Sequence, residues 1–223
     1  MFQIGTLILV ILVPTSLVIY ILTTGYKRST PSNSQTVHIA SPNIFIKEGE
    51  NDPKVVLSIF SDFLCPACSY LEQSFGSTID NLIDRGTIAV NYHMLTILDK
   101  LKNNYSSRSS NASYCIADSS IDSFRKFYSM LYETGVCPKE NSGIYPNNAY
   151  IITMAQQINS NMSIENNKIY NCINKGHYLE IVSNMAKITK IDATPTIIIN
   201  NKDYTLTTPE ALIDKVNIII SKP

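Results

Sequence analysis

The chain begins with one long apolar run. Residues 4–22 (IGTLILVILVPTSLVIYIL) contain no charged side chain, and at about 1.5 Å per residue a helix of this length spans the roughly 30 Å hydrocarbon core of a bilayer. The exit, TTGYKR over residues 23–28, offers no small-x-small cleavage site, which favours an uncleaved anchor over a cleaved signal peptide. We expect a transmembrane signal anchor over residues 1–25 and a polar linker over residues 26–36.

After the linker, strand and helix patterns alternate. The nearly continuous apolar run 54–60 (KVVLSIF) predicts a central strand covered on both faces. From Cys65 to about Arg85 apolar residues recur every three or four positions, which predicts a helix, and residues 87–95 form a second strand pattern. This order predicts an α/β domain with a mixed sheet over residues 37–223.

The middle of the chain, about residues 105–188, is helical in its periodicity. The repeating apolar positions are Ile121, Phe124, Tyr128, Leu131, Ile151, Ile152, Ala155, Ile158, Tyr178, Ile181, Val182 and Met185. Strand patterns return at residues 196–200 and 204–206, around an Asn200–Asn201 turn. Thr208 as N-cap and Pro209 at the first helical position predict a final helix. The sequence therefore predicts a helical subdomain inserted into the sheet domain.

Composition excludes some functions. Lys plus Arg and Asp plus Glu both number 18, and no basic run is present, so we do not expect nucleic-acid binding. Only three histidines occur (His38, His93 and His177), they are scattered, and one Cys-x-x-Cys without a second is a poor match to a zinc site. We expect neither a metal nor a bound cofactor.

Cys65 and Cys68 carry the candidate chemistry. Cys65 follows the apolar strand and opens the predicted helix, where unpaired backbone N–H groups and the helix dipole stabilise a thiolate. We interpret Cys65 as the attacked, partly exposed sulfur. Pro66 suits the first helical position because it lacks an N–H group. Cys68 lies nearly one turn later on the same side, which indicates the resolving thiol. A chance Cys-x-x-Cys or half of a metal site is the alternative reading.

Pro195 is the second feature of interest. Thr194-Pro195 immediately precedes the apolar strand 196–200, and a proline at the mouth of a strand is a plausible cis-peptide site. An ordinary trans proline at a strand edge is the alternative.

Together these motifs resemble DsbA-like thioredoxin-fold proteins, in particular the membrane-anchored proteins of actinobacteria. The likeness covers about residues 37–221 and rests on Phe63-Leu64-Cys65-Pro66-Ala67-Cys68 at a strand-to-helix turn, a helical insert, and Ala193-Thr194-Pro195-Thr196 before a strand. It implies a thioredoxin fold, a cis Pro195 packed against the Cys65–Cys68 disulfide, and a Thr194 backbone that pairs with substrate.

Two positions depart from that family pattern. Ala67 stands where DsbA has a histidine that helps to stabilise the thiolate, and Ile59 stands where many thioredoxins have a buried acid. Asp62 is nearer to the cysteines, but we expect it to be solvated. Cys65 should therefore be less acidic than in DsbA, with a reduction potential between about −120 mV and about −270 mV.

Three further cysteines lie outside the motif. The same resemblance implies a structural disulfide between Cys115 and Cys172, with two buried free thiols as the alternative. We interpret Cys137 as the remaining, exposed thiol.

The expected function is disulfide formation in exported proteins, with the catalytic domain outside the cytoplasm. Lys27 and Arg28 follow the apolar segment, so the positive-inside rule taken alone favours a cytoplasmic domain, whereas the cysteines favour an oxidising compartment. The expected partners are cysteine-containing exported substrates, the membrane through residues 4–22, and, by resemblance, a quinone-linked reoxidant of the DsbB or vitamin K epoxide reductase kind. The alternatives are a reductase or isomerase with the same site, a cytoplasm-facing reductant, and a non-catalytic, membrane-anchored binding module.

Overall fold

The computed structural model describes residues 36–39, 54–101, 104–133, 136–139, 143–158 and 163–222. The expected anchor over residues 1–25 and the linker up to residue 35 lie outside these ranges. Among the helices within these ranges, none has the length and apolar character needed to cross a bilayer.

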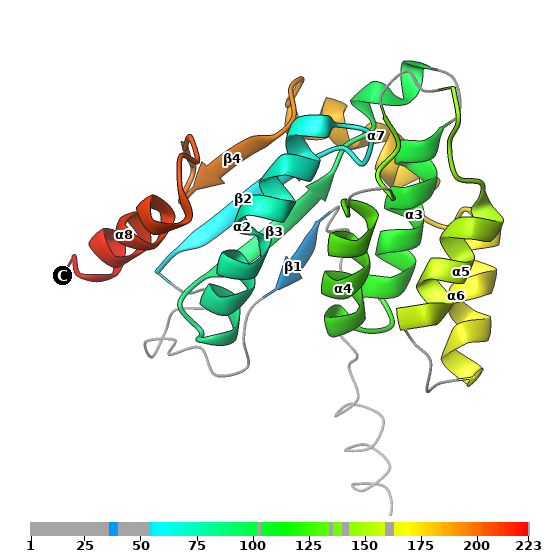
Figure 1. Cartoon of the computed structure of the whole chain (residues 1–223), viewed down its shortest axis with the longest axis horizontal. Helices are drawn as coiled ribbons and strands as arrows, with labels where there is room; N and C mark the ends of the chain where they lie inside the picture. The colour runs from blue at the N-terminus through cyan, green and yellow to red at the C-terminus, as the bar shows by residue number, and fades with distance from the viewer. Residues whose placement is uncertain are drawn as a thin grey trace, which may run out of the picture. The chain divides into compact units, whose positions relative to one another are not determined.

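A five-stranded mixed sheet forms the centre of the domain (Figure 1). Its spatial order is β1-β3-β2-β4-β5. The strands are β1 (Val37–Ile39), β2 (Val56–Ser61), β3 (Ala89–Met94), β4 (Thr196–Ile199) and β5 (Lys202–Asp203). The central strand β2 runs parallel to β3 and antiparallel to β4. Its apolar side chains are nearly all buried, as the continuous apolar run predicts.

Helices cover the sheet and form the insert. They are α2 (Pro66–Asp84), η1 (Ile97–Leu101), α3 (Tyr105–Ala117), α4 (Ile121–Leu131), α5 (Asn148–Ile158), α6 (Ser163–Lys175), α7 (Leu179–Thr189) and α8 (Pro209–Ile220). Figure 1 shows α2 lying across the sheet, with α3 to α6 gathered beside it. The segment from η1 to α7 lies between β3 and β4, so the predicted helical insert is confirmed.

The predicted helix boundaries reflect local chemistry. Cys65 is the N-cap of α2 and Pro66 occupies its first turn. The Thr208 hydroxyl caps α8 by accepting a hydrogen bond from Ala211 N at 3.2 Å. In α4 the residues Phe124, Tyr128 and Leu131 are buried, in agreement with their helical spacing.

The structure differs from the sequence-based prediction at two strands. The short strand β1, which pairs antiparallel with β3, was not predicted. The last strand consists of Lys202 and Asp203 rather than residues 204–206. Asn200 and Asn201 have positive φ values of 48° and 63° and make a two-residue turn, so the register pairs Ile199 with Lys202. Tyr204 follows β5: its N–H group still donates to the Ile197 carbonyl of β4 at 2.9 Å, and its hydroxyl donates to the Ala211 carbonyl in α8 at 3.3 Å.

Candidate active site

The turn between β2 and α2 presents Cys65 to the start of a helix. Cys65 has extended backbone angles, and its N–H group donates to the Asp62 carbonyl at 2.9 Å. The Cys68 N–H group donates to the Cys65 sulfur at 3.3 Å. The sulfur of Cys65 therefore acts as the N-cap acceptor of α2 and receives one of the N–H groups that a helix leaves unpaired at its start.

The two cysteines differ in acidity. Hydrogen bonding from the Cys68 side chain is the main cause that lowers the pKa of Cys65 to about 6, against the opposing effect of burial. Burial, followed by the neighbouring Cys65, raises the pKa of Cys68 well above its ordinary value. Both are free thiols in this structure. Cys65 is thus suited to be the reactive thiolate, and Cys68 the thiol that resolves.

Cys65 is less exposed than expected. Only 6% of Cys65 and 2% of Cys68 is accessible, whereas the intervening Pro66 and Ala67 are exposed. The expectation of a partly exposed Cys65 was therefore wrong at this position, because α2 and the chain around Thr194 cover its side chain.

The segment around Pro195 lies against the thiols. Because β4 pairs antiparallel with β2, Thr196 is opposite Phe60, and the residues before Thr196 reach the turn that follows β2. The Thr194–Pro195 peptide bond is cis. The Cys65 thiol donates to the Thr194 carbonyl at 3.3 Å. The structure thus brings together the two motifs that the sequence separates.

Phe63 anchors this turn in the core. Its side chain is fully buried and stacks on Tyr132 with ring centroids 5.0 Å apart. Its ring also meets Tyr128 edge-on at 5.5 Å. Phe63 therefore anchors the active-site turn in the hydrophobic core, and its side chain is not part of the exposed surface beside Cys65.

Asp62 is buried, not solvated as expected. It is 0% exposed, and its carboxylate accepts hydrogen bonds from Leu64 N and Leu98 N, each at 2.9 Å, and from the Ser106 hydroxyl. Burial raises the pKa of Asp62 above its ordinary value. The expectation failed because two of these donors, Leu98 of η1 and Ser106 of α3, lie far from Asp62 in the sequence. Asp62 ties the active-site turn to the helical insert.

Several polar groups on the buried side of the site were missed. The Ser61 and Tyr128 hydroxyls share a hydrogen bond at 2.7 Å, and the Tyr132 hydroxyl is buried without a hydrogen bond among the described residues. Glu72, four positions after Cys68 on α2, has its pKa raised to about 7 by burial. Tyr128 is one of the apolar positions at helical spacing, whereas no sequence pattern indicates a role for Tyr132. Only the i, i+4 spacing of Cys68 and Glu72 was a usable signal.

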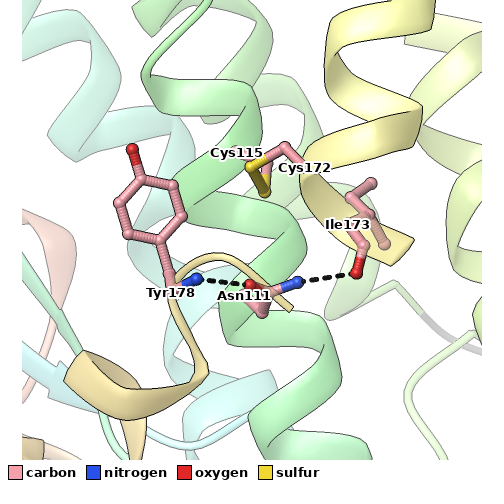
Figure 2. The surroundings of a disulfide bond; sticks show 5 residues. All are labelled: Asn111, Cys115, Cys172, Ile173 and Tyr178. Carbon is pink, nitrogen blue, oxygen red and sulfur yellow. Dashed lines mark hydrogen bonds between the residues drawn. A yellow bond between two sulfur atoms is a disulfide. The ribbon is translucent and has the colours of Figure 1, made fainter. Parts of the chain in front are cut away.

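The disulfide lies inside the helical insert (Figure 2). Cys115 of α3 bonds to Cys172 of α6, with a Cα–Cα distance of 5.8 Å. Next to it, the buried Asn111 side chain donates to the Ile173 carbonyl at 3.2 Å and accepts from Tyr178 N at 2.8 Å. The disulfide and the amide together hold α6 and the start of α7 against α3.

Cys137 is half-buried rather than exposed. Its thiol lies 3.5 Å from the Phe63 carbonyl and 3.7 Å from the Pro138 carbonyl. The loop after α4 turns back toward the active-site turn, which the local sequence does not indicate. Burial raises the pKa of Cys137, so its thiol is less readily ionised than that of Cys65.

The histidines serve other contacts. His93 stacks on Phe60 with centroids 4.2 Å apart, and burial lowers its pKa to about 4. The His38 ring bonds to the Asn91 side chain at 2.6 Å. Within the part of the chain that the structure describes, no three His, Cys, Asp or Glu side chains are arranged to hold a metal ion.

Comparison with known proteins agrees with this geometry. The family model described as Thioredoxin matches residues 44–217. Crystal structures of DsbA from Mycobacterium tuberculosis, oxidised and reduced, are 37% and 36% identical, with a TM-score of 0.78. They cover 84% of this chain and 93% of theirs. The reduced disulfide oxidoreductase DsbG of the same organism is 37% identical and covers 84% of this chain and 88% of its own, also with a TM-score of 0.78.

Two further proteins are less similar to this chain, one in sequence identity and the other in the share of its length that matches. MdbA, a thiol-disulfide oxidoreductase from Corynebacterium diphtheriae, has the same fold at 18% identity and a TM-score of 0.63, covering 82% of this chain and 89% of its own. The serine/threonine-protein kinase PknE of Mycobacterium tuberculosis is 30% identical over 125 residues, which is 55% of this chain but only 22% of the kinase. The family model matches residues 44–217, a range that includes Cys65, Cys68 and Pro195, and the DsbA structures cover 84% of the chain. The chain therefore belongs to the thioredoxin family and, within it, to the DsbA-like protein thiol–disulfide oxidoreductases.

Proposed function

We propose that this oxidoreductase forms disulfides in exported proteins outside the cytoplasm. The observation that carries this direction is the unequal acidity of its thiols, with the pKa of Cys65 lowered to about 6 and that of Cys68 raised. A stabilised Cys65 thiolate favours the reduced enzyme, and an enzyme whose reduced form is stabilised is an oxidant. A pKa near 6 lies between about 3.5 for DsbA and about 7 for thioredoxin, which supports an intermediate potential.

The reaction begins when a substrate thiolate attacks the sulfur of Cys65 in the oxidised enzyme. The Cys65–Cys68 bond breaks, its electron pair passes to Cys68, and a mixed disulfide forms at Cys65. A second substrate thiol then attacks the substrate sulfur and releases Cys65 as a thiolate. Two substrate thiols are oxidised to a disulfide, and the enzyme disulfide is reduced to a dithiol.

Thr194 and Pro195 are the proposed substrate-binding residues. Proline has no N–H group to pair with a neighbouring strand, and the Thr194 carbonyl already lies 3.3 Å from the Cys65 sulfur. A substrate chain bound along this segment places its cysteine beside Cys65. The exposed Pro66 and Ala67 form the adjoining surface.

The presence of a structural disulfide supports an oxidising compartment. The Cys115–Cys172 disulfide is of the kind that persists outside the cytoplasm. With the apolar segment 4–22 as an anchor, the catalytic domain stands at the membrane surface, where a quinone-linked partner of the DsbB or vitamin K epoxide reductase kind restores the Cys65–Cys68 disulfide. Protease accessibility of the domain in intact cells tests this orientation; protection from added protease contradicts it.

Equilibration with glutathione tests the direction. The purified protein is incubated over a series of glutathione ratios, and the Cys65–Cys68 redox state is read by alkylation and mass spectrometry. The expected potential lies between about −120 mV and about −270 mV. A value below this window favours the reductase alternative. The resting redox state in cells adds a second readout, and a predominantly reduced pair counts against an oxidase.

A further inference from the structure

Residues 62–65 form the turn that leads from β2 into α2, and Asp62 closes this turn twice. Its backbone carbonyl accepts a hydrogen bond from the Cys65 N–H group at 2.9 Å. Its carboxylate accepts a second one from the Leu64 N–H group, also at 2.9 Å. Aspartate is favoured at the start of a turn because its side chain bonds to the backbone two residues further on. The backbone conformation just before Cys65 therefore depends on Asp62.

The helical insert holds the same carboxylate from the other side. The Leu98 N–H group of η1 donates to it at 2.9 Å, and the hydroxyl of Ser106, in the first turn of α3, donates to it as well. Asp62 is fully buried, so these protein groups take the place of water around its carboxylate. One side chain thus connects the active-site turn to two elements that follow β3 in the sequence.

The position of the Cys65 sulfur depends on this turn. The sulfur accepts a hydrogen bond from the Cys68 N–H group and donates one to the Thr194 carbonyl, each at 3.3 Å. The first contact stabilises a thiolate, and the second holds the sulfur beside the proposed substrate-binding segment. Because Cys65 is the last residue of the turn, a displaced turn moves the sulfur relative to both partners.

We propose that Asp62 is a positioning residue for disulfide exchange, through which the helical insert sets the place of the Cys65 sulfur at the start of α2. Asp62 acts through the turn and takes no part in bond making. The attacking thiolate bonds to Cys65, the Cys65–Cys68 bond breaks, and the electron pair passes to Cys68. The proposal rests on exchange at this pair and not on its direction.

Asp62→Ala tests the proposal through the alkylation of Cys65. Without the carboxylate the turn is no longer closed at Leu64, and the sulfur should lose its alignment with the Cys68 N–H group. We expect the midpoint of alkylation to rise by about one pH unit, the size of effect for one hydrogen bond to a charged group. In the glutathione equilibrium near about pH 7, the reduced protein should be disfavoured about fivefold relative to wild type, because a less acidic Cys65 stabilises it less.

Ser106→Ala tests the part played by the insert, because it removes one donor to Asp62 and leaves the carboxylate in place. We expect its alkylation midpoint to rise by about half a pH unit, a threefold change in the ionisation constant of Cys65. Ser110→Ala is the matched control. Ser110 lies one turn further along α3 and is equally buried, and its hydroxyl has no hydrogen-bond partner among the described residues. This control should keep the wild-type midpoint.

Three results would overturn the proposal. A lowered midpoint in Asp62→Ala would mean that the carboxylate acts through its charge, which disfavours a nearby thiolate. An unchanged midpoint in Asp62→Ala, despite a loss of stability in urea, would mean that its role is structural only. Equal midpoints in Ser106→Ala and Ser110→Ala would remove the insert from the explanation, and this pair decides the question if Asp62→Ala does not fold. Failure of the oxidase direction would show in the potential of the wild-type protein and leave the differences between variants standing.

Discussion

The Cys65 thiol donates a hydrogen bond to the Thr194 carbonyl at 3.3 Å, although 129 positions separate the two residues. The contact depends on the antiparallel pairing of β2 with β4, which sets Thr196 opposite Phe60. The nucleophile and the proposed substrate-binding segment are therefore positioned by the same pair of strands. A substrate cysteine that reaches Thr194 also reaches the reactive sulfur.

Removing the resolving thiol should trap substrates. In Cys68→Ala, a mixed disulfide formed at Cys65 has no internal thiol to release it, so covalent adducts should accumulate on non-reducing gels and be identified by mass spectrometry. Adding Cys65→Ser should abolish them, and adding Cys137→Ala should not. Adducts joined through Cys137 would contradict the assignment of Cys65 as the attacked sulfur.

Alkylation of the reduced protein should depend on pH with a midpoint near 6. An unfolded cysteine titrates near about 8.5, so Cys65 in the folded protein binds fewer protons between these values. The stability that Cys65 contributes to the reduced form should rise from about pH 6 to about pH 8.5 and be lost as the pH falls through 6.

The unfolding free energies of reduced and oxidised protein at pH 5.5 and pH 8 measure this, with the Cys115–Cys172 bridge intact in both. The oxidised protein is the control because its Cys65 does not titrate. A difference that stays constant with pH would contradict the lowered pKa. In addition, Cys68→Ala should move the alkylation midpoint above 6, since the Cys68 side chain is the main cause of the lowered pKa.

Asp62→Ala should destabilise the protein by about 2–4 kcal/mol. The substitution removes the acceptor of two N–H groups and leaves the buried one of Leu64 and the partly buried one of Leu98 unpaired. Urea unfolding measures the loss, with the exposed Asp214→Ala on α8 as control, for which a change within about 0.5 kcal/mol is expected. Equal effects of the two substitutions would mean that the Asp62 carboxylate is solvated.

The double variant Cys115→Ala/Cys172→Ala should lose about 4 kcal/mol of unfolding free energy. The disulfide closes a loop with a sequence separation of 57, and the chain-entropy relation gives this magnitude. Urea unfolding measures the loss, and Cys137→Ala, which breaks no disulfide, should lose much less. Peptide mapping without reduction checks the pairing; a bridge that contains Cys137 would refute it.

Much of the fold is encoded in local patterns. The apolar run of β2, the helical spacing of α2 and α4, and the Thr208-Pro209 start of α8 all appear in the sequence because each depends on neighbours a few positions away. The same holds for the thiolate site, since a cysteine at the first turn of a helix meets that helix's own N–H groups. These features could be predicted without any knowledge of the tertiary structure.

Other features depend on partners from distant segments. Asp62 follows a strand and looks like a surface acid, yet Leu98 and Ser106 supply the donors that make its burial possible. Tyr132 continues a helical core pattern, and only the tertiary structure packs its ring on Phe63 and brings its carbonyl within hydrogen-bond distance of the Ser69 hydroxyl of α2. β1 is too short to give a pattern, and the register of β5 is decided by the Asn200–Asn201 turn.

By itself, then, the sequence determined the redox pair, the strand and helix order and the helical insert, because periodicity and helix-start chemistry act over a few residues. Only the tertiary structure decided which polar groups are buried around Cys65 and Cys68 and how deeply the thiols lie. Burial and hydrogen-bond partners belong to the assembled chain, and they set the acidity of each thiol.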